Sequence, residues 1–231
     1  MADRPELSSS ARDVVLFGIG HVAEVITVYL ERFSDLNIVG YTVDADYLPE
    51  GGSFNGKPIV AWEEIEMHFP CDQVRLMGPL TYQRLNQVRR DRYLEGKARG
   101  YRFASFIHPA SHILTDQIGE HVIILEQNVI QPFASIGDNI IIWSGNHIGH
   151  HVSIGNHCFL ASMVGIAGNT QIGEQCYLGG QVGINHGLKI GDRCAVLNAI
   201  LIDRDLPDDT ALIGRWKDIK SLPSMRIRHL L

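Results

Sequence analysis

Hydrophobic positions divide the chain into two halves with different periods. From Ile118 onward an aliphatic residue recurs at every sixth position, and an Ile-Gly pair recurs at every eighteenth. This pattern predicts a triangular coil in which each hexad supplies one strand and one corner, so that each turn rises by one strand spacing of about 4.8 Å. The sixth-position residues are Ile118, Ile124, Ile130, Ile136, Ile142, Ile148, Ile154, Leu160, Ile166, Ile172, Leu178, Ile184, Ile190, Val196 and Ile202.

A second inward-facing position follows four residues after each aliphatic one and is mostly compact and apolar. The two positions together predict an all-β left-handed parallel β-helix over residues 106–214. Cys158, Cys176 and Cys194 share this register and are expected to stack as small core residues, since a metal site would need ligands that converge on one point. Asn128 and Asn146 are expected to form an internal amide ladder.

The period changes in the first hundred residues. An apolar run over 14–17 is followed by apolar residues at helical spacing, and further strands are predicted over 37–43 and 73–77. A helix is predicted over 83–100, with Leu85, Val88 and Leu94 turned inward. We therefore expect a small α/β Rossmann-like domain over residues 1–105, and an apolar tail over 215–231 whose packing the sequence leaves open.

The segment Gly18-Ile19-Gly20-His21 follows the first strand and opens the first helix. That context suits a phosphate on backbone N–H groups, although a purely structural tight turn is the alternative. The domain is too short for a complete dinucleotide-binding fold, which favours one nucleoside diphosphate over NAD. Asp44 ends the second strand, where such folds place a carboxylate against a ribose or base. Asp46, or a merely solvated acidic loop, is equally compatible with the sequence.

Composition and charge limit the kinds of partner and the cellular compartment that we expect for this protein. The chain has 231 residues, 45% hydrophobic residues and a formal net charge of −6. The negative charge argues against a nucleic-acid partner. The sequence has no apolar run of the roughly 18 residues that a membrane span needs. The first residues lack the apolar core of a signal peptide, so we expect a cytoplasmic protein with reduced thiols.

The register also sorts the eleven histidines. His150 is the third residue of its hexad, at a corner where side chains point outward, and Gly168 should lie directly over it one coil later. A neutral imidazole there could take a proton from an attacking sugar amine or hydroxyl, and a glycine N–H could bind the oxyanion formed from a thioester. A solvated surface imidazole is the alternative. His151 could orient His150 or contact substrate.

His186 shares the outward face of His150, two coils and nearly 10 Å further along, and is expected nearer to a cofactor. Apart from His21 in the glycine turn, the remaining histidines show no pattern that indicates a catalytic or binding role. These are His68, His108, His112, His121, His147, His157 and His229.

The chain resembles the nucleotide-sugar acetyltransferases of the sialic-acid O-acetyltransferase and bacillosamine-pathway N-acetyltransferase type. The resemblance covers nearly the whole chain. It rests on Gly18-Ile19-Gly20-His21, Phe106-Ile107-His108-Pro109-Ala110, Ile148-Gly149-His150-His151-Val152-Ser153-Ile154-Gly155 and Ala167-Gly168-Asn169.

The resemblance implies a trimer with active sites between subunits, no metal, and acetyl-CoA as co-substrate. It implies His150 as catalytic base, with Gly168 and His151 beside it. The nucleotide sugar would contact Ile19, Gly20, His21, Asp44 and Gly78, and acetyl-CoA would lie near Phe159, Gly168, Gly180 and Asn198.

Three positions depart from the family pattern. His151 stands where the family usually has an acidic residue, Phe159 where it often has a histidine, and Gly78-Pro79-Leu80 where it usually has Gly-Asn-Asn. These changes leave the partner of the base and the nucleotide contacts open.

N-acetylation of an amino sugar on a nucleoside diphosphate is the leading hypothesis. Alternatives are O-acetylation, acyl transfer from acyl carrier protein to a lipid A-type precursor, and metal-dependent hydration through His150, His151 and His186. The last alternative is a protein that binds a nucleotide sugar without catalysing a reaction.

Overall fold

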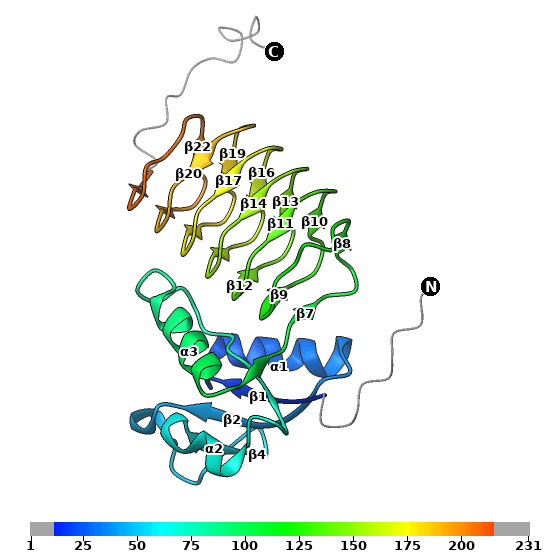
Figure 1. Cartoon of the computed structure of the whole chain (residues 1–231), viewed down its shortest axis with the longest axis vertical. Coiled ribbons are helices and arrows are strands. Elements are labelled where there is room, and N and C mark those ends of the chain that lie inside the picture. Colours follow the sequence, from blue (N-terminus) through cyan, green and yellow to red (C-terminus); the bar gives the residue numbers. More distant parts are fainter. Residues whose placement is uncertain (1–11, 215–231) are drawn as a thin grey trace, which may run out of the picture.

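The computed structural model describes residues 12–214, in which a column of β-coils rises from an α/β domain (Figure 1). Residues 1–11 and the predicted tail over 215–231 lie outside the described residues. Within 12–214, no helix is both long enough and apolar enough to cross a membrane.

The α/β domain is built on a sheet in the order β3-β4-β2-β1-β5-β6. Its strands are β1 (Asp13–Phe17), β2 (Asn37–Val43), β3 (Ser53–Phe54), β4 (Lys57–Ala61), β5 (Arg75–Met77) and β6 (Arg102–Phe103). Its helices are α1 (His21–Phe33), α2 (Ile65–His68) and α3 (Gln87–Ala98). The Rossmann-like fold is confirmed, but the sheet has more strands than expected because β4 and the short β3 and β6 gave no clear alternation in the sequence.

The central strand β1 pairs in parallel with β2 on one side and β5 on the other. The chain therefore reverses its direction of winding at β1. Ligands of open α/β sheets bind at such switch points, outside the carboxyl ends of the strands.

The coils form three parallel walls. The first wall contains β7 (Phe106–Ile107), β9 (Val122–Ile124), β12 (Ile140–Ile142), β15 (Phe159–Leu160), β18 (Tyr177–Leu178), β21 (Ala195–Val196) and β23 (Ala211–Leu212). The second contains β8 (His112–Ile113), β10 (Val129–Ile130), β13 (His147–Ile148), β16 (Gly165–Ile166), β19 (Gly183–Ile184) and β22 (Leu201–Ile202). The third contains β11 (Ser135–Ile136), β14 (Ser153–Ile154), β17 (Gln171–Ile172) and β20 (Lys189–Ile190).

Strand pairing confirms the predicted register of 18 residues, for example Ile148 with Ile166 and Ile166 with Ile184. The aliphatic residues of the hexads fill one continuous core. Inside it, Asn146 Nδ2 donates to Asn128 Oδ1 at 2.9 Å, and Asn146 Oδ1 accepts from the Val164 N–H at 2.7 Å. The predicted amide ladder is therefore present.

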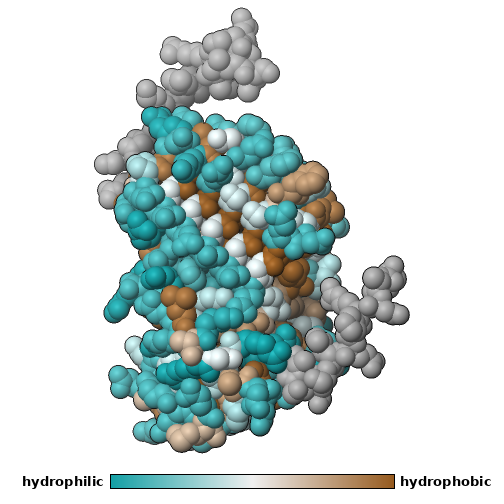
Figure 2. Space-filling view, in the orientation of Figure 1, coloured by the Kyte–Doolittle hydropathy of each residue, from teal (hydrophilic) through white to brown (hydrophobic). Residues whose placement is uncertain are grey.

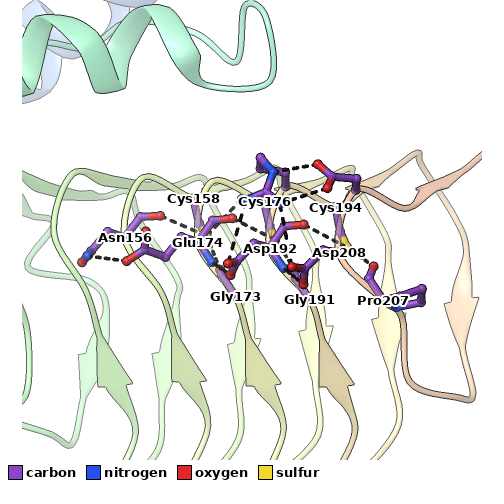
Figure 3. A network of polar contacts seen from close by, with 12 residues as sticks. Asn156, Cys158, Gly173, Glu174, Cys176, Gly191, Asp192, Cys194, Pro207 and Asp208 are labelled. Atoms are coloured by element: carbon purple, nitrogen blue, oxygen red, sulfur yellow. Dashed lines mark hydrogen bonds and ion pairs between the residues drawn. The ribbon is translucent and has the colours of Figure 1, made fainter.

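The three stacked cysteines are buried free thiols at one corner of the coil (Figure 3). Each thiol donates to a carbonyl oxygen of the next coil: Cys158 to Gly173 at 3.2 Å, Cys176 to Gly191 at 3.2 Å and Cys194 to Pro207 at 3.3 Å. The hydrogen bond with Cys158, and then burial, raises the pKa of the Cys176 thiol. These thiols are core residues, as the register predicted, and they donate hydrogen bonds to carbonyl oxygens at the corner of the coil.

The α/β domain packs against the first wall of the coils, where residues such as Ile123, Ile141 and Phe159 join its apolar core. Helix α3 contributes to this interface with a different face from the one the sequence indicated. Leu94 is 44% exposed, whereas Arg89, Tyr93 and Gly96 are buried. The prediction that Leu94 turns inward is wrong because the coils, rather than the sheet alone, cover α3.

Arg89 is the buried cation of this interface. Its guanidinium donates to the carbonyl oxygens of Asn139, His157 and Cys158 and to Asn86 Oδ1, and none of these acceptors carries a charge. Burial lowers the pKa of Arg89 to about 10, so the side chain remains charged at neutral pH. A fork of five N–H donors suits this cluster of acceptors.

Acid is expected to loosen the structure through His121, which is 1% exposed beside Arg89. Burial, and then the Arg89 charge, lowers the pKa of His121 to about 3. Since the unfolded chain binds the proton at a pKa of about 6.5, stability from this group is complete above about pH 6.5 and is lost as the pH falls toward 3. From pH 7 to pH 5 we expect the free energy of unfolding to fall by about 2 kcal/mol from this residue alone.

Urea unfolding at pH 7 and pH 5 measures the loss. The variant His121→Gln has no ionisable group at this position and should lose less stability over the same interval. Equal losses in the variant and the parent would show that His121 does not carry the effect.

Candidate active site

The His150 side chain lies at the corner between β13 and β14, exposed to solvent. The expected juxtaposition with Gly168 is present. A Cβ atom built on Gly168 would lie only 2.6 Å from both Nε2 and Cε1 of the His150 ring. The ring therefore lies flush against the Gly168 backbone, at a position where only glycine leaves room for it.

The N–H of Gly168 is not used by the coil. At other corners this third-position N–H donates to a side-chain oxygen one coil later, for example Glu174 N to Asp192 Oδ1 at 2.8 Å and Gly180 N to Asn198 Oδ1 at 3.0 Å. Among residues 12–214, the Gly168 N–H donates no hydrogen bond. An unpaired donor beside an imidazole is the arrangement that stabilises a developing oxyanion.

His151 contacts the other side of the His150 ring. The two Nδ1 atoms are 3.1 Å apart, and the Phe133 ring packs on His151 with centroids 4.7 Å apart. One of these nitrogens must carry a proton and the other must accept it. If His150 Nδ1 is the donor, its Nε2 has a free lone pair on the side of Gly168.

His186 lies closer to His150 than the register predicted. Their ring centroids are 6.3 Å apart, not nearly 10 Å, and the intervening coil has Gly168, without a side chain, at the equivalent position. The Asn169 Nδ2 lies 3.2 Å from His186 Nε2. His186 therefore belongs to the same cluster as His150 and His151. No three His, Cys, Asp or Glu side chains in the described part of the chain are arranged to hold a metal ion.

The residues predicted to bind the nucleotide sugar lie at the carboxyl edge of the sheet. The turn Gly18-Ile19-Gly20 follows β1, Asp44 follows β2 and Gly78 follows β5. At Gly20 the space where a Cβ would point is open, and His21 is exposed at the start of α1. Because β1 is the switch-point strand, these residues gather at the sheet edge where ligands of open α/β sheets bind in a crevice.

Two of these residues already have partners. Asp44 Oδ1 lies 3.0 Å from Arg92 Nε and 2.9 Å from Arg92 Nη2, so its carboxylate is held by α3. Gly78 is buried and its N–H donates to His121 Nε2 at 2.8 Å. This N–H is therefore not free for a ligand, a contact that the sequence did not indicate.

The positions predicted to hold acetyl-CoA are divided between different parts of the coil. Phe159 is only 3% exposed and packs against Tyr82, with ring centroids 5.1 Å apart, on the wall that faces the α/β domain. Gly180 and Asn198 lie at the corner between the first and second walls. Asn198 lines a groove of about 610 Å³ together with Tyr82, Leu85, Tyr177, Ala195, Leu197 and Gly214. Within one chain, only Gly168 of this set lies beside His150.

Gly168→Ala is expected to reduce activity without unfolding the coil. The added methyl would meet the His150 ring at 2.6 Å, and because the obstructing atoms belong to an exposed side chain, the ring would swing away. Misplacement of the base on this scale is expected to lower kcat by about 10²-fold. Steady-state kinetics, with circular dichroism melting to verify the fold, measures this.

Gly165→Ala is the matched control, since nothing lies within 4 Å of a Cβ built at Gly165 in the same coil. A Gly168→Ala variant as active as Gly165→Ala would contradict the proposed placement of the ring.

Comparison with known proteins gives three kinds of result. Residues 133–168 match the family model described as bacterial transferase hexapeptide (six repeats). No curated protein matches the chain. Among solved structures, the acetyltransferase domain of PglB from Neisseria gonorrhoeae, in complex with acetyl coenzyme A, has a TM-score of 0.77 and 19% identity, covering 88% of this chain and 97% of that one.

PerB from Caulobacter crescentus, in complex with CoA and GDP-perosamine, has a TM-score of 0.74 and 25% identity, covering 87% of this chain and 94% of that one. WeeI from Acinetobacter baumannii has a TM-score of 0.54 and 20% identity, covering 87% and 96%. These matches extend over both domains.

The coils thus contain repeats of the bacterial transferase hexapeptide type. The resemblance to the nucleotide-sugar acetyltransferases, suggested by short motifs, is confirmed over the α/β domain and the coils together.

Proposed function

We propose that this protein moves the acetyl group of acetyl-CoA to the amine of a sugar carried on a nucleoside diphosphate. The observation that carries the proposal is the His150 ring lying against Gly168, whose N–H has no acceptor among residues 12–214. The ligands named for PglB and PerB, acetyl coenzyme A and GDP-perosamine, support the choice of donor and acceptor.

The reaction follows from this geometry. The amine attacks the thioester carbonyl while His150 Nε2 accepts its proton, and the Gly168 N–H donates to the oxygen that gains negative charge. Collapse of the tetrahedral intermediate breaks the C–S bond, and the proton on His150 passes to the leaving CoA thiolate. His151 accepts the Nδ1–H of His150 and so keeps the tautomer whose Nε2 lone pair faces Gly168.

His151 acts on the His150 base differently from an acidic residue at the same position. A neutral imidazole orients His150 but brings no negative charge to stabilise the protonated base. Once protonated, His151 can no longer accept the hydrogen bond. The Phe133 ring, 4.7 Å from the His151 ring, holds it in the accepting orientation.

We propose a homotrimer as the active form. The predicted nucleotide-sugar residues around Gly20 lie in the α/β domain, which covers the first wall, whereas His150 lies at the corner between the other two walls. A neighbouring copy could therefore supply the base for a sugar held by this one. Figure 2 shows a band of neutral and apolar residues across the coils, a surface suited to such packing. Light scattering coupled to size exclusion tests the subunit number.

The test of the reaction is purified protein with acetyl-CoA and UDP-, GDP- and dTDP-linked amino sugars, with release of the CoA thiol measured. Thiol release that requires one of these sugars is the expected result. Thiol release with none of them, but with the corresponding hydroxyl sugars, would replace N-acetylation by O-acetylation. Binding without thiol release would overturn the assignment of acyl transfer to these sugars.

A further inference from the structure

We propose that His121, in the first coil of the β-helix, is a positioning residue that fixes the nucleotide-sugar crevice of the α/β domain. This inference rests on the proposed function and extends it to a histidine for which the sequence showed no role. It concerns the loop Gly78-Pro79-Leu80, which leaves β5 at the switch point and carries no polar side chain of its own.

A side chain from the other domain holds this loop. The Gly78 N–H donates to His121 Nε2 at 2.8 Å, and both residues are buried. The loop then folds back on itself through a hydrogen bond of 2.7 Å from the Leu80 N–H to the Gly78 carbonyl. The Leu80 side chain lies against the glycine turn, since a Cβ built on Gly18 would be 3.3 Å from Leu80 Cδ2. A shift of Gly78 would therefore move the Leu80 side chain that lies beside Gly18.

A ladder of side chains one coil apart fixes the proton positions of His121. Its Nε2 must accept from the Gly78 N–H, so its Nδ1 carries the hydrogen and donates to Asn139 Oδ1 at 2.9 Å. Arg89 Nη1 lies 3.1 Å from the same Asn139 oxygen, which fixes the orientation of that amide. The Asn139 Nδ2 then donates to His157 Nδ1 at 2.8 Å. Every member of the ladder is buried, and the hydrogen bonds that His121 Nε2 and His157 Nδ1 accept require uncharged imidazoles.

Aromatic rings hold His121 in place. Tyr93 stacks on it with ring planes 5° apart and centroids 5.8 Å apart, and Phe103 lies with its centroid at 4.9 Å. The ring is thus fixed by packing as well as by hydrogen bonds, as a side chain that positions a binding loop must be.

The coil itself supplies substitutions that should fold. His121 has a φ of 55°, in the left-handed region, and the same corner position elsewhere is occupied by Gln175 with a φ of 57° and Phe133 with a φ of 66°. Glutamine can accept from Gly78 through its oxygen and donate to Asn139 through its nitrogen. Phenylalanine keeps the stacking with Tyr93 but removes both hydrogen bonds.

The experiment compares His121→Gln and His121→Phe with His157→Phe. His157 occupies the equivalent corner two coils later and contacts Tyr93 and Asn139, but it does not touch Gly78. In the full-length protein we measure KM for the active nucleotide sugar, KM for acetyl-CoA, kcat, and hydrogen exchange of the backbone amides of Gly78 and Leu80.

His121→Phe is expected to raise KM for the nucleotide sugar about tenfold, the effect of losing one buried hydrogen bond, with kcat and KM for acetyl-CoA within about twofold of the parent. Exchange at Gly78 should become faster. His121→Gln should restore KM to within about threefold, and His157→Phe should leave it unchanged.

An unchanged KM in His121→Phe, or an equal rise in His157→Phe, would overturn the positioning role. A parent protein that neither binds nor acetylates any nucleotide sugar would instead overturn the proposed function, and the inference with it. The two failures are therefore separate results.

Discussion

His150→Ala is expected to lower kcat by about 10²–10⁴-fold, the range that general base catalysis contributes, while the coil remains folded. The side chain is exposed, so its removal leaves no cavity, and the neighbouring Gly149 and Gly168 backbone is held by coil-to-coil hydrogen bonds. We expect the free energy of unfolding to change by no more than about 0.5 kcal/mol. The measurement is thiol release under saturating acetyl-CoA and nucleotide sugar, with urea unfolding in parallel.

His147→Ala is the matched control. His147 is an exposed histidine on β13 in the same coil, and nothing in the structure directs it toward Gly168. Its replacement should leave kcat unchanged. Full turnover by His150→Ala would remove the base from the mechanism, and an equal loss in both variants would point to a general effect on the coil.

Arg89→Met is expected to lower the free energy of unfolding by about 3–5 kcal/mol. Methionine has a similar length but leaves the buried carbonyl oxygens of Asn139 and His157 without a donor, while that of Cys158 keeps only its hydrogen bond from the Ile141 N–H. Each unpaired buried acceptor costs roughly 1–3 kcal/mol, and relaxation of the coil recovers part of it. Urea unfolding monitored by circular dichroism and by tryptophan fluorescence measures the loss and shows whether the two domains still unfold together.

Arg90→Met is the matched control for charge and helix position. Arg90 is half-buried and, among residues 12–214, forms an ion pair only with Asp91, at 3.7 Å, so its replacement should cost less than about 1 kcal/mol. If Arg89→Met were no less stable than Arg90→Met, the buried guanidinium would not be what joins α3 to the coils.

The periodicity of hydrophobic residues in the sequence predicted most of the fold. A hexad pattern is local, because each residue's direction in a β-coil depends only on its place in the repeat. The pattern therefore gave the coil, the stacked cysteines and asparagines, and the position of Gly168 over His150. The glycine turn and Asp44 were placed correctly at the carboxyl edge of the sheet for the same reason, since each follows a strand that the sequence marked.

Contacts between the two domains could not be predicted from the sequence. A repeat shows which side chains point outward but not which outward surface another domain covers. Phe159 and His157 occupy outward positions of the coil that the α/β domain buries. The helical pattern over 83–100 gave no sign that Arg89 is buried, because its carbonyl acceptors in the coils lie 50 to 69 positions away.

The sequence alone thus determined the coil and the pairing of His150 with Gly168, because both follow from a short repeat. Only the tertiary structure decided which face of α3 is buried, how close His186 comes to His150, and that His121 holds Gly78. The first and the last of these features depend on buried hydrogen bonds between residues that no local pattern connects, and the second depends on side-chain orientations that the repeat does not fix.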